Sequence, residues 1–447
     1  MKKFFILVIV LAIVSSIYAQ STNKKVAIIG AGMSGVSAAH YIRKIDTNAE
    51  ITIFEKEKSV GGNAKTIAID NNGKKVYVDL GPQYFTQGPW DDYIALLKEY
   101  GLFNEAEISK FIATISVQNL NREKADFISP KGGSLRGENP NELMQFLKFY
   151  SEARKAYIGK ESVPEKIGDW VVSLGLREDF KTNVVLPFLA STLGTSIENI
   201  KETSTKHIVS LFAFNPALEK SEFSIFDKGM GNILKSLAAK VQQKNVSIKT
   251  NSKVVSVDKQ GEKYILTYEN NGTQTKEFDF VVFAIHPDHA SAILRNNKDA
   301  QLLKVIETLN KFRYFGSLVV LHRDDAMINK EKESFFNIKT DGNNKIYANS
   351  MNLGVINSDL KGIYRTLMNA DALKRVKSNN TFIHQEFFFH PLITPKFVNS
   401  AILLKSQVKS IKNLYFAGGW SEGLETQNTA TISGKNAAEK YRLFVSK

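Results

Sequence analysis

The chain has 447 residues, which is too long for one small hydrophobic core, so two domains or one large composite are expected. Hydrophobic residues make up 43% and aromatic residues 11% of it, which excludes wholesale disorder. The formal net charge is +14, but the lysines are scattered. We therefore expect a solvated lysine-rich surface and no binding to nucleic acid. The absence of cysteine excludes disulfides and thiol chemistry.

The first twenty residues have the pattern of a secretory signal peptide. Lys2 and Lys3 form a positive region, Phe4 to Val14 is uninterrupted apolar sequence, and small residues lead to Ala19. An uncleaved membrane anchor is the alternative, but it needs about 20 apolar residues, more than this run has. We expect removal of residues 1–19, a mature chain without a stable membrane span, and a location that is secreted, periplasmic or in the endomembrane lumen.

Residues 24–55 have the order of elements of a dinucleotide-binding unit. A short apolar run from Val26 to Ile29 predicts a strand, and a glycine turn with the spacing G-x-G-x-x-G follows it. A helical segment then leads to a second strand, Ile51 to Phe54, which ends at Glu55. The flanking strands, helix and acid make this pattern far more specific than the glycines alone.

Each feature of such a unit has a physical role here. Gly30 permits the tight turn, Gly32 lets the backbone approach a pyrophosphate, and Gly35 lets the helix pack closely on the strand. The helix N-terminus offers free N–H groups to the phosphates. Glu55 is placed to accept hydrogen bonds from the ribose hydroxyls of an adenosine.

Two further glycine turns follow in chain order. The doublet Gly61-Gly62, followed by Asn63, allows a loop to lie against a cofactor where side chains would collide. An alternating strand from Val76 then runs into the turn Gly81-Pro82.

The middle of the chain predicts an excursion from the nucleotide-binding sheet and a return to it. Residues 90–227 show largely helical periodicity. A glycine turn at Gly229 then opens a helix, and short strands follow it. The last of these strands, FDFVVFAI at 278–285, is almost entirely apolar, as in a central strand buried on both faces. His286 ends this strand and lies at the carboxyl edge of the predicted sheet; a turn residue before Pro287 is the simpler interpretation.

A second excursion precedes the C-terminal segment. Residues 302–403 mix strand-like runs with polar loops, and residues 413–439 predict a strand, a glycine turn and a last helix. His322 and Asp324 share one side of a strand, but the sequence offers too few further ligands for a metal site. No metal is therefore expected.

Taken together, the motifs resemble those of the flavin amine oxidase and phytoene desaturase superfamily. The motifs that carry the resemblance are GAGMSG at 30–35, Glu55, Gly61-Gly62, VDLGPQYF at 78–85, DKGMGN at 227–232, FDFVVFAI, and LYFAGGW at 414–420 before ATISGKNAAEK. The resemblance implies an α/β fold, with an interrupted Rossmann-type FAD-binding domain and an amine-oxidase-like α+β substrate domain. The implied boundaries are 24–89, 228–290 and 405–447 for the first domain, and 90–227 and 291–404 for the second.

The same resemblance implies FAD as the cofactor and assigns further residues to it. Gly61 and Gly62 would meet the phosphate or ribityl chain, Gly81 and Pro82 would lie near the isoalloxazine, and Val255 would pair with the adenine through its backbone. The remaining implied cofactor-binding residues are Asn63, Gly418, Gly419, Ala430 and Thr431. Ala430 and Thr431 would lie at the N-terminus of the last helix, whose dipole stabilises the negative charge of a reduced flavin.

The chain departs from the family pattern at three places. Asn63 replaces the usual arginine after the glycine doublet, with Lys65 as a candidate phosphate partner. Gly419 replaces the acid that usually bonds the ribityl hydroxyls, and Glu422 or Glu425 is a candidate substitute. The strand that begins Gly316-Ser317 has valine where many amine oxidases have a lysine near flavin N5.

These features predict an FAD-dependent oxidoreductase that transfers a hydride from a substrate C–H to flavin N5, with oxygen as the electron acceptor. The substrate is a small molecule, either an amine or an apolar, lipid-like compound. Two alternatives remain open: a double-bond isomerase or desaturase that acts on an unsaturated lipid, and a flavin-binding protein without turnover. The catalytic residues are unknown from sequence, with Trp420 and His286 as candidates for the pocket.

Overall fold

The computed structural model describes residues 23–87, 90–129, 140–159, 162–213, 223–331 and 333–446. The predicted signal peptide, residues 1–19, lies outside the described residues. The helices are α2 (Met33–Ile45), α3 (Asp91–Glu99), α4 (Pro140–Ile158), α5 (Ile167–Ser173), α6 (Glu178–Phe180), α7 (Leu186–Leu193), α8 (Ile197–Lys201), α9 (Thr205–Ala213), α10 (Met230–Gln242), α11 (Pro287–Leu294), α12 (Ala300–Leu309), α13 (Ala370–Ser378), α14 (Pro395–Lys409) and α15 (Gln427–Val445). A π-helical turn, Lys181–Val185, joins α6 to α7.

A five-stranded parallel sheet forms one half of the molecule. Its order is β10 (Val246–Lys249), β2 (Glu50–Phe54), β1 (Lys25–Ile29), β14 (Phe280–Phe283) and β20 (Leu414–Phe416). All four neighbouring pairs are parallel. Strands from distant parts of the chain therefore end at one common edge. This confirms the predicted α/β class and the return of residues 278–285 to the first sheet.

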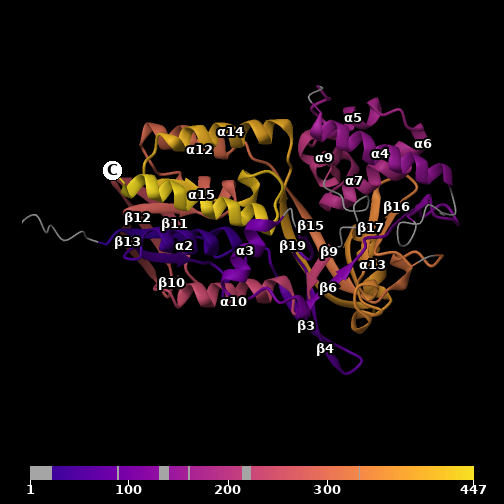
Figure 1. Ribbon diagram of the computed structural model, residues 1–447, viewed down its shortest axis with the longest axis horizontal. Coiled ribbons are helices and arrows are strands. Elements are labelled where there is room, and N and C mark those ends of the chain that lie inside the picture. The colour runs from indigo at the N-terminus through magenta and orange to yellow at the C-terminus, as the bar shows by residue number, and fades with distance from the viewer. Residues whose placement is uncertain are drawn as a thin grey trace, which may run out of the picture.

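The central strands of this sheet are buried on both faces, which explains their continuous apolar sequence. Val26, Ile28 and Val282 pack against α2, α10 and α15 on one face. Ala27 and Val281 pack on the other face against α11, α12, α14 and a small antiparallel sheet, which consists of β11 (Lys253–Gln260), β12 (Lys263–Glu269) and β13 (Thr273–Phe278). Figure 1 shows α12 and α14 along one side of this half and α10 along the opposite side.

A seven-stranded mixed sheet forms the core of the other half. Its order is β19 (Phe382–Pro391), β15 (Tyr314–His322), β18 (Tyr364–Met368), β17 (Ile346–Asn352), β16 (Phe336–Thr340), β7 (Ile115–Asn119) and β8 (Phe127–Ile128). The parallel pairing of β16 with β7 joins the two long excursions of the chain in one sheet. Helices α4 to α9 gather at this end of the molecule (Figure 1), whereas α13 packs on Val320 through Ala372 and Val376. The exact domain boundaries stay a prediction.

Two smaller sheets lie between the halves. One is the hairpin of β3 (Thr66–Asn71) and β4 (Lys74–Asp79), and the other consists of β5 (Phe85–Thr86), β9 (Phe223–Phe226) and β6 (Ile108–Phe111). The expectation of largely helical structure over 90–227 is therefore wrong for β6 to β9. These strands have five residues or fewer, and so short a run shows no clear period of two. The prediction of strands and loops over 302–403 is similarly incomplete, because it did not include α12, α13 and α14.

The carboxylate of Asp79 links the β3–β4 hairpin to the five-stranded half. It accepts hydrogen bonds from the backbone N–H of Met230 at 2.8 Å and from the hydroxyl of Thr66. Met230 and Gly231 begin α10, so Asp79 caps a helix that is far away in the sequence. Burial raises the pKa of Asp79 to about 6, although these hydrogen bonds favour the ionised form.

Replacement of Asp79 by alanine leaves the backbone N–H of Met230, at the start of α10, without its acceptor. We expect Asp79→Ala to lower the free energy of unfolding by about 1–2 kcal/mol, measured by urea denaturation. Asp91→Ala is the matched control because Asp91 is exposed in the first turn of α3. Equal loss of stability in the two variants would contradict the capping role.

Candidate functional site

The glycine turn after β1 is closed by backbone contacts that only glycine permits. Gly30 has a φ of 102°, and a Cβ on it would collide with the carbonyl of Ala284 at the end of β14. A Cβ on Gly35 would collide with the carbonyl oxygen of Gly30. Gly32 differs, since its nearest neighbour in the protein would be the Cα of Gly62 at 3.8 Å. The fold thus requires Gly30 and Gly35, and leaves the space beside Gly32 open.

Glu55 and the glycine doublet close around this turn. The buried carboxylate of Glu55 accepts hydrogen bonds from the backbone N–H of Ala31 at 2.8 Å and of Glu57 at 2.9 Å. The N–H of Gly61 donates to the carbonyl of Ala31 at 3.0 Å. A Cβ on Gly62 would lie 3.1 Å from the Cα of Gly32. The structure therefore brings the first six predicted cofactor residues into one cradle of backbone.

The loop at Gly81 lies directly against the glycine doublet. A Cβ on Gly81 would collide with the carbonyl oxygen of Asn63, so the two predicted turns are in contact, and Pro82 follows half-buried. Asn63 is itself exposed. Lys65 forms an ion pair with Glu386 of β19 at 2.6 Å. Its charge is thus directed to the second sheet.

The sequence analysis missed Arg365, which holds this loop from β18. Arg365 is 7% exposed. Its guanidinium donates to the carbonyl of Leu80 at 2.6 Å and to that of Gly81 at 3.2 Å. Among the described residues no carboxylate lies within ion-pair distance of it, and burial lowers its pKa to about 10. A lone arginine in a strand gives no sign in the sequence that it will meet a loop so far away.

Gly418 and Gly419 follow β20 at the same edge of the sheet. The N–H of Gly418 donates to the hydroxyl of Ser433 in α15 at 2.7 Å, and a Cβ on Gly419 would lie 3.2 Å from the Cα of Glu425. Trp420 is 2% exposed and donates from Nε1 to the carbonyl of Ile285 at 3.3 Å. Its ring packs on Phe312 with 5.0 Å between centroids, so Trp420 lies in the core beside the site.

The N-terminus of α15 also reaches this edge. Thr426 and Thr429 form a capping box, in which each side chain bonds the other's backbone N–H. Ala430 and Thr431 lie within the first two turns, and the hydroxyl of Thr431 donates to the carbonyl of Gln427 at 2.8 Å. The capping box fixes where α15 begins, and Thr426 and Thr429 of this box lie beside Gly419.

Val255 lies at an irregularity in the small antiparallel sheet. The register passes from Val254 paired with Tyr268 to Ser256 paired with Thr267, so Val255 is the extra residue of a β-bulge. The backbone N–H and C=O groups of a bulged residue are left unpaired by the adjacent strand, so they can bond to another group. The predicted contact with an adenine stays a prediction.

Two buried amides near the site have oxygens without partners. The side-chain oxygens of Gln83 and Gln427 have no hydrogen-bond partner in the described part of the chain. Gln83 follows the Gly81-Pro82 turn and Gln427 begins α15. Buried polar groups are normally hydrogen-bonded, so these two oxygens are the acceptors that a bound molecule would satisfy. Neither residue was predicted from the sequence to bind the cofactor.

His286 lies at the carboxyl edge of β14, as predicted. Its ring stacks on that of Tyr314 with 4.5 Å between centroids. Burial lowers the pKa of His286 to about 4, and it does the same for His390 of β19. Both imidazoles are therefore neutral at neutral pH. His286 also precedes Pro287 at the start of α11. It is therefore both a turn residue before a proline and a residue at the carboxyl edge of the sheet.

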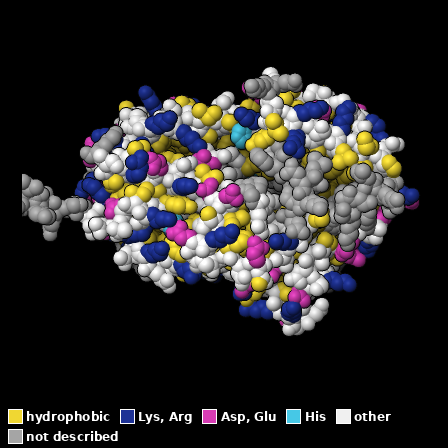
Figure 2. Space-filling view, in the orientation of Figure 1, with side chains coloured by type: hydrophobic (Ala, Val, Ile, Leu, Met, Phe, Trp, Pro, Cys, Tyr) yellow, Lys and Arg dark blue, Asp and Glu magenta, His cyan; other side chains and the backbone are white. Residues whose placement is uncertain are grey.

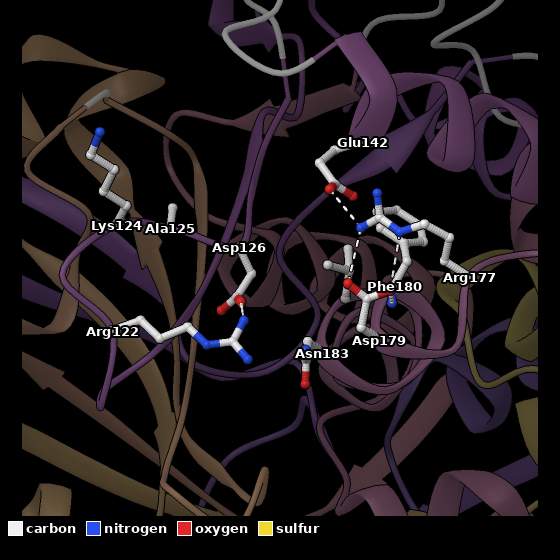
Figure 3. Close-up of a pocket in the computed structure, with 10 residues that line it drawn as sticks. Arg122, Lys124, Ala125, Asp126, Glu142, Arg177, Asp179, Phe180 and Asn183 are labelled. Atoms are coloured by element: carbon white, nitrogen blue, oxygen red, sulfur yellow. Dashed lines mark hydrogen bonds and ion pairs between the residues drawn. The ribbon is translucent and has the colours of Figure 1, made fainter.

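A separate cavity of about 270 Å³ lies in the helical end of the other half. Figure 3 shows that all but one of its charged side chains pair with one another, the exception being Lys124: Arg177 meets Glu142 at 2.7 Å and Asp179 at 3.0 Å, and Arg122 meets Asp126. Paired charges leave little to recruit a ligand, so this cavity does not compete with the glycine cradle as the main site.

Three further observations concern metal ligands, membrane spans and surface charge. Among the described residues no three His, Cys, Asp or Glu side chains converge as metal ligands. Within the same residues, no helix has both the length and the apolarity needed to cross a bilayer. Figure 2 shows lysine and arginine side chains scattered over the visible face rather than gathered in a stripe.

These observations define a protein that binds a dinucleotide at the carboxyl edge of a Rossmann-type sheet. Comparison with known proteins specifies it further. Residues 33–323, more than half of the chain, match the family model described as flavin containing amine oxidoreductase. The chain belongs to this family, whose members are FAD-dependent oxidoreductases. The family resemblance and the cofactor inferred from the sequence are therefore confirmed.

Individual relatives are distant. Coproporphyrinogen III oxidase of Staphylococcus aureus is 25% identical over 280 residues, which cover 56% of this chain and 58% of that protein. The chain thus matches little more than half the length of this relative. The structure of cyclohexylamine oxidase from Brevibacterium oxydans aligns with a TM-score of 0.63 at 13% identity, covering 95% of this chain and all of that one. A CLA-producing fatty acid isomerase from P. acnes aligns with a TM-score of 0.60 at 12% identity and the same coverage. These likenesses confirm the fold.

The residues of the cradle fit FAD. The open space beside Gly32, the closely approaching backbone of Gly62 and the helix start at Met33 suit a pyrophosphate. The unpaired oxygens of Gln83 and Gln427 suit the N–H groups of a flavin ring. The site lacks an acid at Gly419, where Thr429 Oγ1 would lie 3.0 Å from an added Cβ. The roles of individual residues toward FAD stay predictions.

Alanine substitutions at Gly32 and Gly35 should distinguish an effect on cofactor binding from an effect on folding. We expect Gly32→Ala to leave the melting temperature of the apoprotein nearly unchanged and to weaken FAD binding at least about tenfold, because the added methyl fills the space for the pyrophosphate. Gly35→Ala should instead destabilise the fold, because its Cβ meets the Gly30 carbonyl. Thermal melting and flavin fluorescence titration measure the two effects. Unchanged FAD affinity in Gly32→Ala would contradict the pyrophosphate assignment.

Proposed function

We propose that the protein is an FAD-dependent oxidoreductase that removes a hydride from a C–H of a small molecule, either an amine or an apolar, lipid-like compound, with oxygen as the final electron acceptor. The observation that carries the proposal is the contact between the cradle and the second sheet, where Gly81 meets Asn63 and Arg365 holds Gly81. A cofactor in the cradle then lies beside a sheet that can bind a substrate. Bound FAD supplies the hydride acceptor.

The residues around Gly81 provide an apolar wall. A Cβ on Gly81 would lie 3.5 Å from the ring of Phe388, which is buried on β19. Leu367 of β18 packs against Gly194, where a Cβ would lie 2.7 Å from it. Phe388 and Leu367 orient an apolar substrate and exclude water from the reacting atoms, which keeps electrostatic interactions strong there.

The residues on β15 favour an apolar substrate over a simple amine. Val319 is 1% exposed and Val320 is 0% exposed, and they enter apolar clusters on opposite faces of the sheet. Neither face of this strand therefore presents the lysine amino group that many amine oxidases use. An isomerase or desaturase acting on an unsaturated lipid is the second candidate, and the likeness to the fatty acid isomerase supports it.

Anaerobic bleaching of the flavin tests the proposal. The FAD-loaded chain is mixed with panels of amines and of unsaturated lipids, and its absorption spectrum is followed. We expect bleaching with at least one compound and recovery of the spectrum when air is admitted. Bleaching by amines alone would contradict the lipid hypothesis, and product formation without net bleaching would indicate an isomerase. Bound flavin that no compound reduces or converts would indicate a binder without turnover, and absence of bound flavin would contradict the whole proposal.

We also propose that the chain is exported, on the pattern of Lys2, Lys3 and the apolar run Phe4 to Val14. We expect cleavage after Ala19. Mass spectrometry of the exported chain should give an N-terminus at Gln20, whereas an intact Met1 on the exported protein would contradict cleavage.

A further inference from the structure

Strand β19 forms one edge of the seven-stranded sheet and carries three exposed phenylalanines. Phe382, Phe387 and Phe389 are 37%, 51% and 53% exposed. Their partners in β15 stand at alternate positions of that strand, 322, 318 and 316, so the three rings lie on one face of the sheet. Among the described residues no strand pairs with the other side of β19. We call these three side chains the phenylalanine row.

The two most exposed rings of the row hold each other in place. The rings of Phe387 and Phe389 pack edge to face with 5.1 Å between centroids. Gly316 leaves room for them, because a Cβ on it would collide with the ring of Phe387. Apolar side chains exposed together on an edge strand promote association, and such patches mark surfaces that bind a partner or a membrane. The phenylalanine row therefore has the character of a docking surface.

One strand separates this row from the loop that borders the cofactor site. Phe388, between the two most exposed rings, points to the opposite face, where it is 3% exposed and lies 3.5 Å from a Cβ on Gly81. On the outer face, α13 covers Val320 of β15 through Ala372, but the rings of the row stay exposed. A surface docked on the row would thus lie directly behind the strand that borders the Gly81 loop.

Cations surround the phenylalanine row. Nζ of Lys377 on α13 lies 5.4 Å from the centroid of the Phe382 ring. Lys374 is exposed on the same helix, and Arg313 is exposed just before β15, where this strand pairs with the end of β19. None of the three cations forms an ion pair within the described residues. Against them stands one exposed acid of α13, Asp371, so the surround of the row is positively charged.

We propose that the phenylalanine row docks the protein on an anionic lipid surface. The rings enter the boundary between headgroups and acyl chains, and the cations meet the lipid phosphates. A second copy of the chain fits this face poorly. Antiparallel pairing of two β19 edges would bring Lys377 of one copy toward Arg313 of the other, and each copy carries a net charge of +14. The docking goes beyond the proposed oxidation and does not depend on it.

Vesicle flotation tests the docking. The chain is purified with the cofactor that it retains and is mixed with vesicles of phosphatidylglycerol and phosphatidylcholine in equal parts, or of phosphatidylcholine alone. We expect binding to the anionic vesicles and at least about tenfold weaker binding to the neutral ones. The double variant Phe387→Ser/Phe389→Ser should bind the anionic vesicles at least about tenfold more weakly than the wild type. Val172→Ser is the matched control, because Val172 is 69% exposed on α5, away from the row, and it should bind as the wild type does.

A fluorescence measurement locates the contact and decides the matter if the serine variant does not fold. Phe389→Trp places an indole in the row, and Val172→Trp places one on the control surface. Brominated lipid quenches an indole that enters the bilayer. We expect the fluorescence of Phe389→Trp to fall when the anionic vesicles contain brominated lipid, and that of the wild type and of Val172→Trp to stay the same.

Several outcomes would overturn the proposal. They are wild-type binding that is absent or shows no preference for anionic vesicles, equal binding of the wild type and the folded serine variant, and no quenching in Phe389→Trp. Analytical ultracentrifugation without lipid tests the other occupant: a wild-type dimer that the serine variant abolishes would assign the row to a second copy of the chain instead. None of these measurements needs turnover, so a flavin that no compound reduces would contradict the proposed function and leave the docking intact.

Discussion

The cofactor site depends on one backbone atom, the carbonyl oxygen of Gly30. The body of α2 rests on it at Gly35, and β14 lies against the same turn through the carbonyl of Ala284. At these contacts backbone packs directly on backbone, so no side chain can adjust to relieve a collision. The turn, the helix and two parallel strands are thereby fixed together. Glu55 and Gly61 then add hydrogen bonds to Ala31 in the same turn. The glycine turn at Gly30 is therefore the centre relative to which the other turns of the site are placed.

Charged groups connect this centre to the second sheet. Arg365 reaches from β18 to the carbonyls of Leu80 and Gly81, and Lys65 pairs with Glu386 of β19. A buried guanidinium without an acid beside it is expensive, and Arg365 lowers this cost through the carbonyl dipoles of the very loop that borders the site. The second sheet thus holds the loop at Gly81 in place.

Sequence and structure agree where a local pattern reflects a local constraint. The strands at 26–29 and 280–283 can be predicted because burial on both faces makes their sequences continuously apolar. The turn at Gly30 and Gly35 can be predicted because few residues other than glycine fit such a tight turn. Contacts between residues that are far apart in the sequence could not be predicted in this way. The sequence makes Lys65 a candidate phosphate partner, yet in the structure Lys65 pairs with Glu386, which comes from a strand that the sequence does not place. Arg365 and Tyr314 were missed because their significance lies in contacts with distant loops.

The helix α15 closes the sheet that begins at β1, and this has a consequence for the order of folding. Gly434 has no side chain, so α15 packs directly on α2, where a Cβ would lie 2.7 Å from the backbone nitrogen of Ala38 and would collide with Ser37. The first unit of the chain therefore cannot cover its apolar face until the last helix has been synthesised. Contacts of such long sequence separation form slowly. In a nascent chain the nucleotide-binding unit is therefore completed only after the last helix has left the ribosome.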